Sequence, residues 1–189
     1  MTNDPEPRTP DPLPMPQDPI ESKFILHWGE MGAKWGVNRT VAQIHALLYI
    51  RDEPLNAEQI SETLHVARSN VSTSLRELIG WGIVRTEPVL GDRRDHYVSM
   101  KDVWAMLEKV LDERKKRECD PTLAVLAECL EQCKATGAPQ RITDRLREMH
   151  GFFETMSIWY VALRRLPTGS LRTFFKMSGK VKKFMGLAS

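Results

Sequence analysis

The chain has 189 residues and a formal net charge of +2 at pH 7, with 41% hydrophobic and 28% charged residues, an ordinary globular composition. No apolar run approaches the roughly 20 residues of a membrane span, and the N-terminus lacks the apolar region of a signal peptide, so neither a membrane protein nor a secreted one is expected. Three cysteines, an odd number, argue against a disulfide framework and favour a cytoplasmic location.

The charge is distributed unevenly along the chain. Residues 1–19 contain seven of the twelve prolines, one arginine and four acidic residues, which predicts a disordered, acidic tail. Residues 163–189 contain seven basic residues and no acidic one. Residues 20–100 are close to neutral, so nucleic-acid binding there would depend on a local arrangement of charges.

The globular part is predicted to begin near Ile20 with two helices, over residues 21–36 and 39–50. In the first helix, aromatic and apolar residues recur at helical spacing: Phe24, Ile25, Trp28, Met31 and Trp35. The second carries a similar apolar stripe. The sequence "DEPLN" then ends the second helix and predicts a short extended segment.

A helix-turn-helix is predicted next. Asn56 has the profile of an N-cap, and Gln59, three residues later, completes a capping box for a helix over residues 57–65. A tight turn over residues 65–67 leads into a second helix from Arg68 to about Trp81. In that helix Val71, Leu75, Leu78 and Ile79 are expected to face the core.

Two β-favouring runs follow, over residues 83–89 and 95–100, and the turn between them contains glycine and aspartate, which predicts a hairpin. Residues 101–189 are predicted to be helical. This order is typical of a winged helix-turn-helix: a mainly α fold with a small β-hairpin wing. Residues 20–100 would form the DNA-binding domain, and helices on both sides of it would mediate dimerisation.

The second helix of the helix-turn-helix has one polar face. At about 100° per residue, Leu75 and Leu78 fall within roughly 40° of Val71, which leaves Ser69, Thr73 and Arg76 on the opposite side. Short hydroxyl groups and an arginine suit contacts with base edges and phosphates in a major groove. A solvated helix surface could have the same composition.

The predicted hairpin places Arg93 and Arg94 at its tip, where arginine can enter a narrow minor groove. Asp92 is expected to brace the turn or an arginine. An ordinary exposed hairpin end could also be charged. The spacing of this tip after the polar helix nevertheless favours DNA binding over a solvated helix surface and an ordinary charged hairpin end.

The sequence "LNAEQISETLHVARSNVSTSLRELIGWGIVRTEPVLGDRRDHYVSM" resembles the MarR superfamily of winged helix-turn-helix regulators. Its continuation, "KDVWAMLEKVLDERKKRECDPTLAVLAECL", is similar more narrowly to the GbsR branch. The resemblance implies a homodimeric transcriptional regulator, often a repressor, that binds an inverted-repeat operator in double-stranded DNA. It also implies a small-molecule effector such as an osmolyte.

The resemblance carries the DNA-contacting positions of the family onto Arg68, Ser69, Asn70, Ser72, Thr73, Arg76 and, in the wing, Arg93 and Arg94. Ala67 departs from the pattern, because a serine commonly caps the recognition helix there. A cap worth about 1 kcal/mol is therefore expected to be absent.

Several alternatives stay open. A winged helix can be a protein-docking or assembly module that binds no DNA, and the near-neutral charge of residues 20–100 supports that alternative. Cys119, Cys129 and Cys133 could be redox sensors, contribute to a metal site or be structural. The basic C-terminal segment could dock onto the dimer, add phosphate contacts or lie on a membrane.

Five aromatic residues could form a cage for a quaternary ammonium ligand, or belong to the core or to an interface: Trp28, Trp35, Trp104, Trp159 and Tyr160. His150 and Glu154 form no recognisable catalytic motif, so no enzyme, cofactor or metal is expected.

Overall fold

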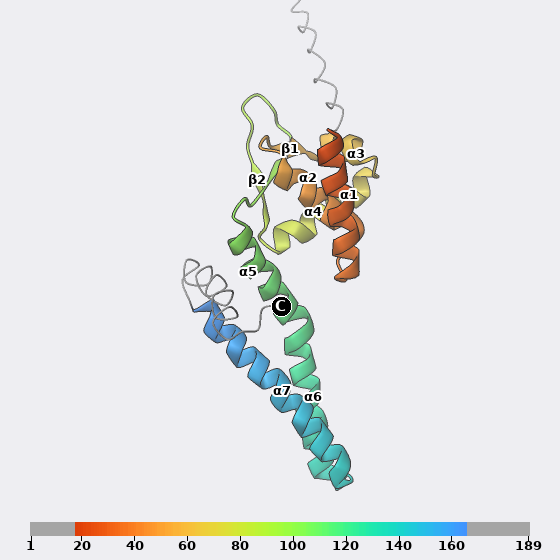
Figure 1. Cartoon of the computed structure of the whole chain (residues 1–189), viewed down its shortest axis with the longest axis vertical. Helices are drawn as coiled ribbons and strands as arrows, with labels where there is room; N and C mark the ends of the chain where they lie inside the picture. Colours follow the sequence, from red (N-terminus) through yellow and green to blue (C-terminus); the bar gives the residue numbers. More distant parts are fainter. Residues whose placement is uncertain (1–17, 166–189) are drawn as a thin grey trace, which may run out of the picture. The chain divides into compact units, whose positions relative to one another are not determined.

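The computed structural model describes residues 18–165. The chain divides into two compact units, and the boundary in the sequence falls between Lys101 and Asp102. In the first unit (Figure 1) the elements are α1 (Pro19–Lys34), α2 (Arg39–Ile50), β1 (Leu55–Asn56), α3 (Ala57–Leu64), α4 (Arg68–Gly80), β2 (Val84–Glu87) and β3 (His96–Ser99). In the second they are α5 (Val103–Arg114), the π-helical turn η1 (Lys115–Cys119), α6 (Asp120–Thr136) and α7 (Gln140–Arg164).

Helices α1 and α2 form a tightly packed pair. The Asp18 side chain caps α1 and the Asn38 side chain caps α2, each by accepting a backbone N–H bond two residues later. A Cβ atom at Gly32 would lie 2.5 Å from Cβ of Ala42, so only glycine permits this approach of the two helices. Helix α2 buries most of its residues because it also packs against α4.

The helix-turn-helix consists of α3 and α4. The predicted capping box of α3 is confirmed: the Asn56 side chain accepts the N–H of Gln59, and the Gln59 side chain accepts the N–H of Asn56. His65 ends α3 in the left-handed region at φ 53°, and Ser61 Oγ donates to the Val66 carbonyl at 2.7 Å. These local bonds fix the turn that positions α4.

The wing is a three-stranded antiparallel sheet with the strand order β1-β3-β2. Val84 pairs with Ser99 and Glu87 with His96, while Asn56 of β1 lies on the other side of His96. The loop between β2 and β3 extends beyond the ends of these strands (Figure 1), and its Arg94 contacts Glu58 of α3. The predicted winged helix-turn-helix, mainly α with a small β wing, is therefore confirmed.

The second unit is a helical hairpin. The Asp102 side chain caps α5, and Gly137 ends α6 with a positive φ of 65°, as Gly at this position commonly does. Helices α6 and α7 pack side by side (Figure 1). Within the described residues, α6 has no fully buried side chain. A hairpin that buries so little leaves apolar surface available for a partner.

A polar cluster joins the two ends of this unit. The Tyr160 hydroxyl donates to Asp112, and the Arg164 guanidinium donates to Asp112 at 3.0 Å and to Glu108 at 2.5 Å. Burial and the hydrogen bond to Asp112 raise the pKa of Tyr160 above its usual value. The cluster holds the C-terminal turns of α7 against α5. The rest of the predicted basic segment, and residues 1–17 of the predicted tail, lie outside the described residues. The predicted boundary of the tail is wrong by two residues, because Asp18 caps α1 and Pro19 begins it.

Candidate nucleic-acid interface

Helix α4 presents the polar face that its sequence predicts. Val71, Leu75 and Leu78 are buried, at 2% exposure or less. The predicted contact residues on the helix are all exposed: Arg68, Ser69, Asn70, Ser72, Thr73 and Arg76. One expectation is wrong: Ile79 is 41% exposed, because it lies about 80° round the helix from Val71, at the edge of the apolar stripe. The helix therefore offers solvent one continuous polar surface.

The start of α4 lacks a side-chain cap, as Ala67 predicts. Ala67 has the extended conformation of an N-cap, with φ −59° and ψ 138°, but forms no capping bond. Ser72 Oγ donates to the Arg68 carbonyl at 3.0 Å, which keeps this hydroxyl on the first turn. The uncapped N–H groups and the Arg68 side chain make the first turn of α4 suitable for binding an anion such as a phosphate.

The two arginines of the wing differ in their environments. Arg93 is exposed and, among the described residues, has no hydrogen bond or ion pair recorded. Arg94 pairs within the loop: its Nε donates to both carboxylate oxygens of Asp92, and its NH2 lies 2.6 Å from Asp92 Oδ2. The predicted bracing role of Asp92 is thus observed. DNA contact by Arg94 stays a prediction, and it requires the Arg94 guanidinium to exchange a carboxylate partner for a phosphate.

Bonds from Arg94 to Asp92, and from His96 to the Arg94 carbonyl, stabilise this wing loop. Hydrogen bonds from the Arg94 side chain and backbone lower the pKa of Asp92 to about 2, so this carboxyl stays ionised at neutral pH. His96 is buried, and its Nδ1 lies 2.9 Å from the Arg94 carbonyl oxygen, to which it donates. These bonds connect the two sides of the loop to each other.

Glu58 is not among the site residues predicted from the sequence. Glu58, in the first turn of α3, has Oε1 at 3.9 Å from Arg68 NH1 and Oε2 at 3.2 Å from Arg94 NH1. One carboxylate therefore connects the start of α4 to the wing. Local signals could mark Glu58 only as an exposed residue beside the capping box, because Arg94 is 36 residues away in the chain.

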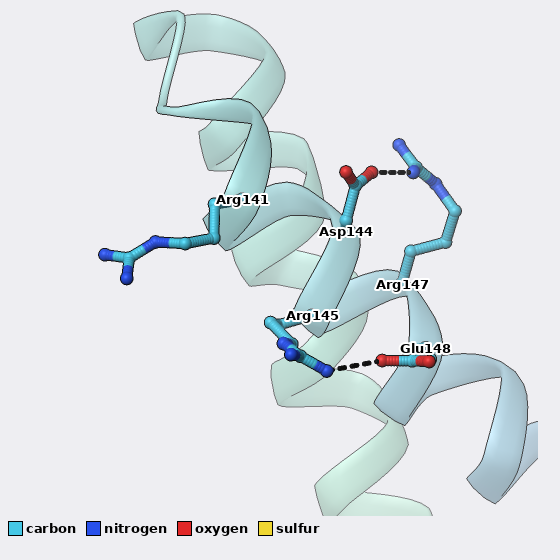
Figure 2. Close-up of a pocket in the computed structure, with 5 residues that line it drawn as sticks. All are labelled: Arg141, Asp144, Arg145, Arg147 and Glu148. Atoms are coloured by element: carbon cyan, nitrogen blue, oxygen red, sulfur yellow. Dashed lines mark hydrogen bonds and ion pairs between the residues drawn. The ribbon is translucent and has the colours of Figure 1, made fainter.

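A hollow on α7 offers no comparable site. It has about 650 Å³ and is lined by residues of α7 alone. Figure 2 shows Asp144 paired with Arg147 and Arg145 with Glu148, while Arg141 points away from both pairs. Four of the five charged groups form pairs along a single helix, and the five do not converge on a common point.

The other candidate residues lie in separate surroundings. Trp28 packs against Phe24 and His45 in the first unit, with ring centroids 5.5 and 6.2 Å away, while Trp35 is 59% exposed. The three cysteines are half-buried free thiols, and no cluster of metal-binding side chains occurs among residues 18–165. No helix in that range is long and apolar enough to cross a membrane.

Comparisons with known proteins agree with this fold. Residues 35–95 match the model of the MarR family. A crystal structure of a transcriptional regulator is 21% identical and has a TM-score of 0.54, with 84% of this chain and 99% of that chain covered. No curated protein sequence matches the chain.

Two further solved structures are more distant. The transcriptional regulator Tm0710 from Thermotoga maritima is 20% identical, with a TM-score of 0.36 over 71% of this chain and 89% of that one. A mutant of S. aureus MepR bound to an oligodeoxyribonucleotide is 17% identical, with a TM-score of 0.37 over 69% and 92%. The geometry and the first structure therefore agree on a winged helix-turn-helix fold, and residues 35–95 of it resemble the MarR family.

Proposed function

We propose that the protein is a DNA-binding transcriptional regulator that acts as a homodimer. The observation that carries this proposal is the exposed face of α4, which presents Arg68, Thr73 and Arg76 beside short hydroxyl and amide side chains. In this arrangement α4 lies in the major groove and the wing, with the free Arg93, reaches the adjacent minor groove.

A dimer is supported by a stripe of exposed apolar residues on α7. Ile142, Met149, Phe152, Met156 and Trp159 are 44%, 50%, 58%, 53% and 64% exposed. From Met149 to Trp159 their spacings alternate between three and four residues, the pattern by which one helix packs against another. A second copy would cover this stripe and place two recognition helices about 34 Å apart, which suits an inverted-repeat operator.

The resemblance of the sequence to the GbsR branch supports a proposal about how the protein is regulated. We propose that it is a repressor and that a small-molecule effector, such as an osmolyte, favours one separation of the two recognition helices over another. Thermal denaturation with and without choline or glycine betaine tests the effector. Preferential binding to the native state would raise the melting temperature, whereas an unchanged melting temperature at millimolar concentrations contradicts the choice of effector.

Titration of a random-sequence duplex at low and rising salt tests DNA binding itself. A protein that neutralises phosphates should bind at low salt and weaken steeply as salt rises. Arg76→Ala and Arg93→Ala should each weaken binding roughly tenfold, the scale of one lost charged contact, without lowering the melting temperature. Arg141→Ala, which removes the same charge from the exposed surface of α7, is the matched control and should change binding little.

The competing possibility is a docking module that binds no DNA. It gains support from the near-neutral charge of residues 20–100. Absence of binding to the duplex at micromolar protein and low salt would favour this alternative. Normal binding by both arginine variants would instead show that another face of the first unit contacts the DNA.

A further inference from the structure

Glu58 occupies an unusual position for an acidic residue, because it lies between two of the cations proposed to contact DNA. Its carboxylate is half exposed and reaches Arg68 with one oxygen and Arg94 with the other, at 3.9 and 3.2 Å. Arg68 begins the recognition helix, and Arg94 belongs to the wing. Both arginines therefore share the Glu58 carboxylate as a counter-ion on the surface proposed to face the phosphates, and Arg94 also pairs with Asp92.

Asp92, the other carboxylate near Arg94, has a different relation to the surface. It accepts the Arg94 backbone N–H at 2.9 Å as well as the guanidinium, and its side chain is only 22% exposed. The bonds to Asp92 hold the loop together, so Arg94 can keep them while DNA binds. Glu58 is 46% exposed and touches Arg94 through NH1, the guanidinium nitrogen for which a phosphate could compete.

We propose that Glu58 is an internal substitute for a DNA phosphate: it pairs with Arg68 and Arg94 in the free protein, and the DNA backbone displaces it. This inference rests on the proposed function. Binding then exchanges two intramolecular ion pairs for two protein–phosphate pairs, and the released carboxylate remains near the phosphates. Because like charges repel, Glu58 lowers the affinity for DNA and thereby limits binding to arbitrary sequences.

The salt dependence carries a distinctive signature. DNA binding releases counterions from the phosphates, whereas a displaced Glu58 takes up a cation from solution and partly offsets that release. Removing the carboxylate abolishes the uptake. The slope of log affinity against log salt concentration should then become more negative by up to about 1, which corresponds to one more ion released on binding.

Glu58→Gln is the variant that tests this role, because it preserves the size of the side chain. The capping box uses the side chains of Asn56 and Gln59, so it remains intact. Glu62→Gln is the matched control: it removes an exposed carboxylate one turn later on the same helix, which forms no ion pair within residues 18–165. Both variants lose one negative charge, so their difference isolates the pairing.

Fluorescence anisotropy with a 30-base-pair random-sequence duplex provides the measurement, at several salt concentrations. Glu58→Gln should bind roughly three- to tenfold more tightly than wild type at low salt, with the steeper slope, whereas Glu62→Gln should stay close to wild type. In an Arg68→Ala background the gain from Glu58→Gln should shrink, because one of its two partners is absent.

Two results would overturn the inference while leaving the proposed function intact. In one, wild type binds DNA and Glu58→Gln matches Glu62→Gln. In the other, Glu58→Gln binds more weakly and melts at a lower temperature, which would make Glu58 a brace of the wing. If wild type fails to bind the duplex at low salt, the proposed function itself is wrong.

Discussion

His45 is a single residue whose surroundings determine how stability depends on pH. It is buried in α2 between the rings of Trp28 and Tyr49, whose centroids both lie 6.2 Å from the imidazole. Its Nε2 has no hydrogen-bond partner among the described residues. Burial lowers the pKa of His45 from 6.5 to about 4, so the native state holds the neutral form at pH 7.

The sign of the pH effect follows from this lowered pKa. The unfolded chain binds a proton near pH 6.5 and the native state only near pH 4, so stability is full above pH 6.5 and declines as the pH falls toward 4. We expect His45 to reduce the free energy of unfolding by about 2 kcal/mol between pH 7 and pH 4.5. Urea denaturation of wild type and His45→Phe at both pH values measures this loss of stability. Other groups titrate alike in both proteins, so an equal loss in wild type and His45→Phe would show that His45 does not cause it.

At the scale of the element, the start of α4 can be stabilised by one hydroxyl. Ala67 already has an N-cap backbone conformation and lacks only an acceptor side chain. Ala67→Ser should stabilise the protein by about 1 kcal/mol and raise the melting temperature by a few degrees, as measured by calorimetry. Ala67→Asp should stabilise it similarly but weaken DNA binding, because its charge faces the phosphates. An unchanged melting temperature in both variants would show that the first turn of α4 frays in the native protein.

The elements also show why some features could be predicted from sequence and others could not. The capping box of α3, the uncapped start of α4 and the exposure of Arg76 depend on residues within one or two turns, so local patterns suffice. The pairing of Glu58 with Arg94 depends on how the wing folds over α3, which no local pattern encodes. The π-helical turn over Lys115–Cys119, where a regular helix was expected, likewise has no recognised local signal.

At the scale of the whole molecule, the apolar stripe on α7 makes assembly testable within one helix. Trp159 and Ile158 are neighbours with the same exposure, 64%, but only Trp159 belongs to the stripe. Ile158 lies roughly 150° round the helix from the centre of the stripe. Trp159→Glu places a charge where the second copy would pack, whereas Ile158→Glu places the same charge outside that contact.

We expect Trp159→Glu to shift the protein from dimer to monomer in sedimentation experiments and Ile158→Glu to leave it dimeric, with equal helix content by circular dichroism. Loss of the dimer should weaken operator binding by about a hundredfold or more, because the two half-sites then bind separate molecules. Equal sedimentation of the two variants would place the dimer contact on another face. A monomer that still binds the operator as tightly as wild type would mean that each chain reads the DNA alone, since avidity requires both recognition helices in one assembly.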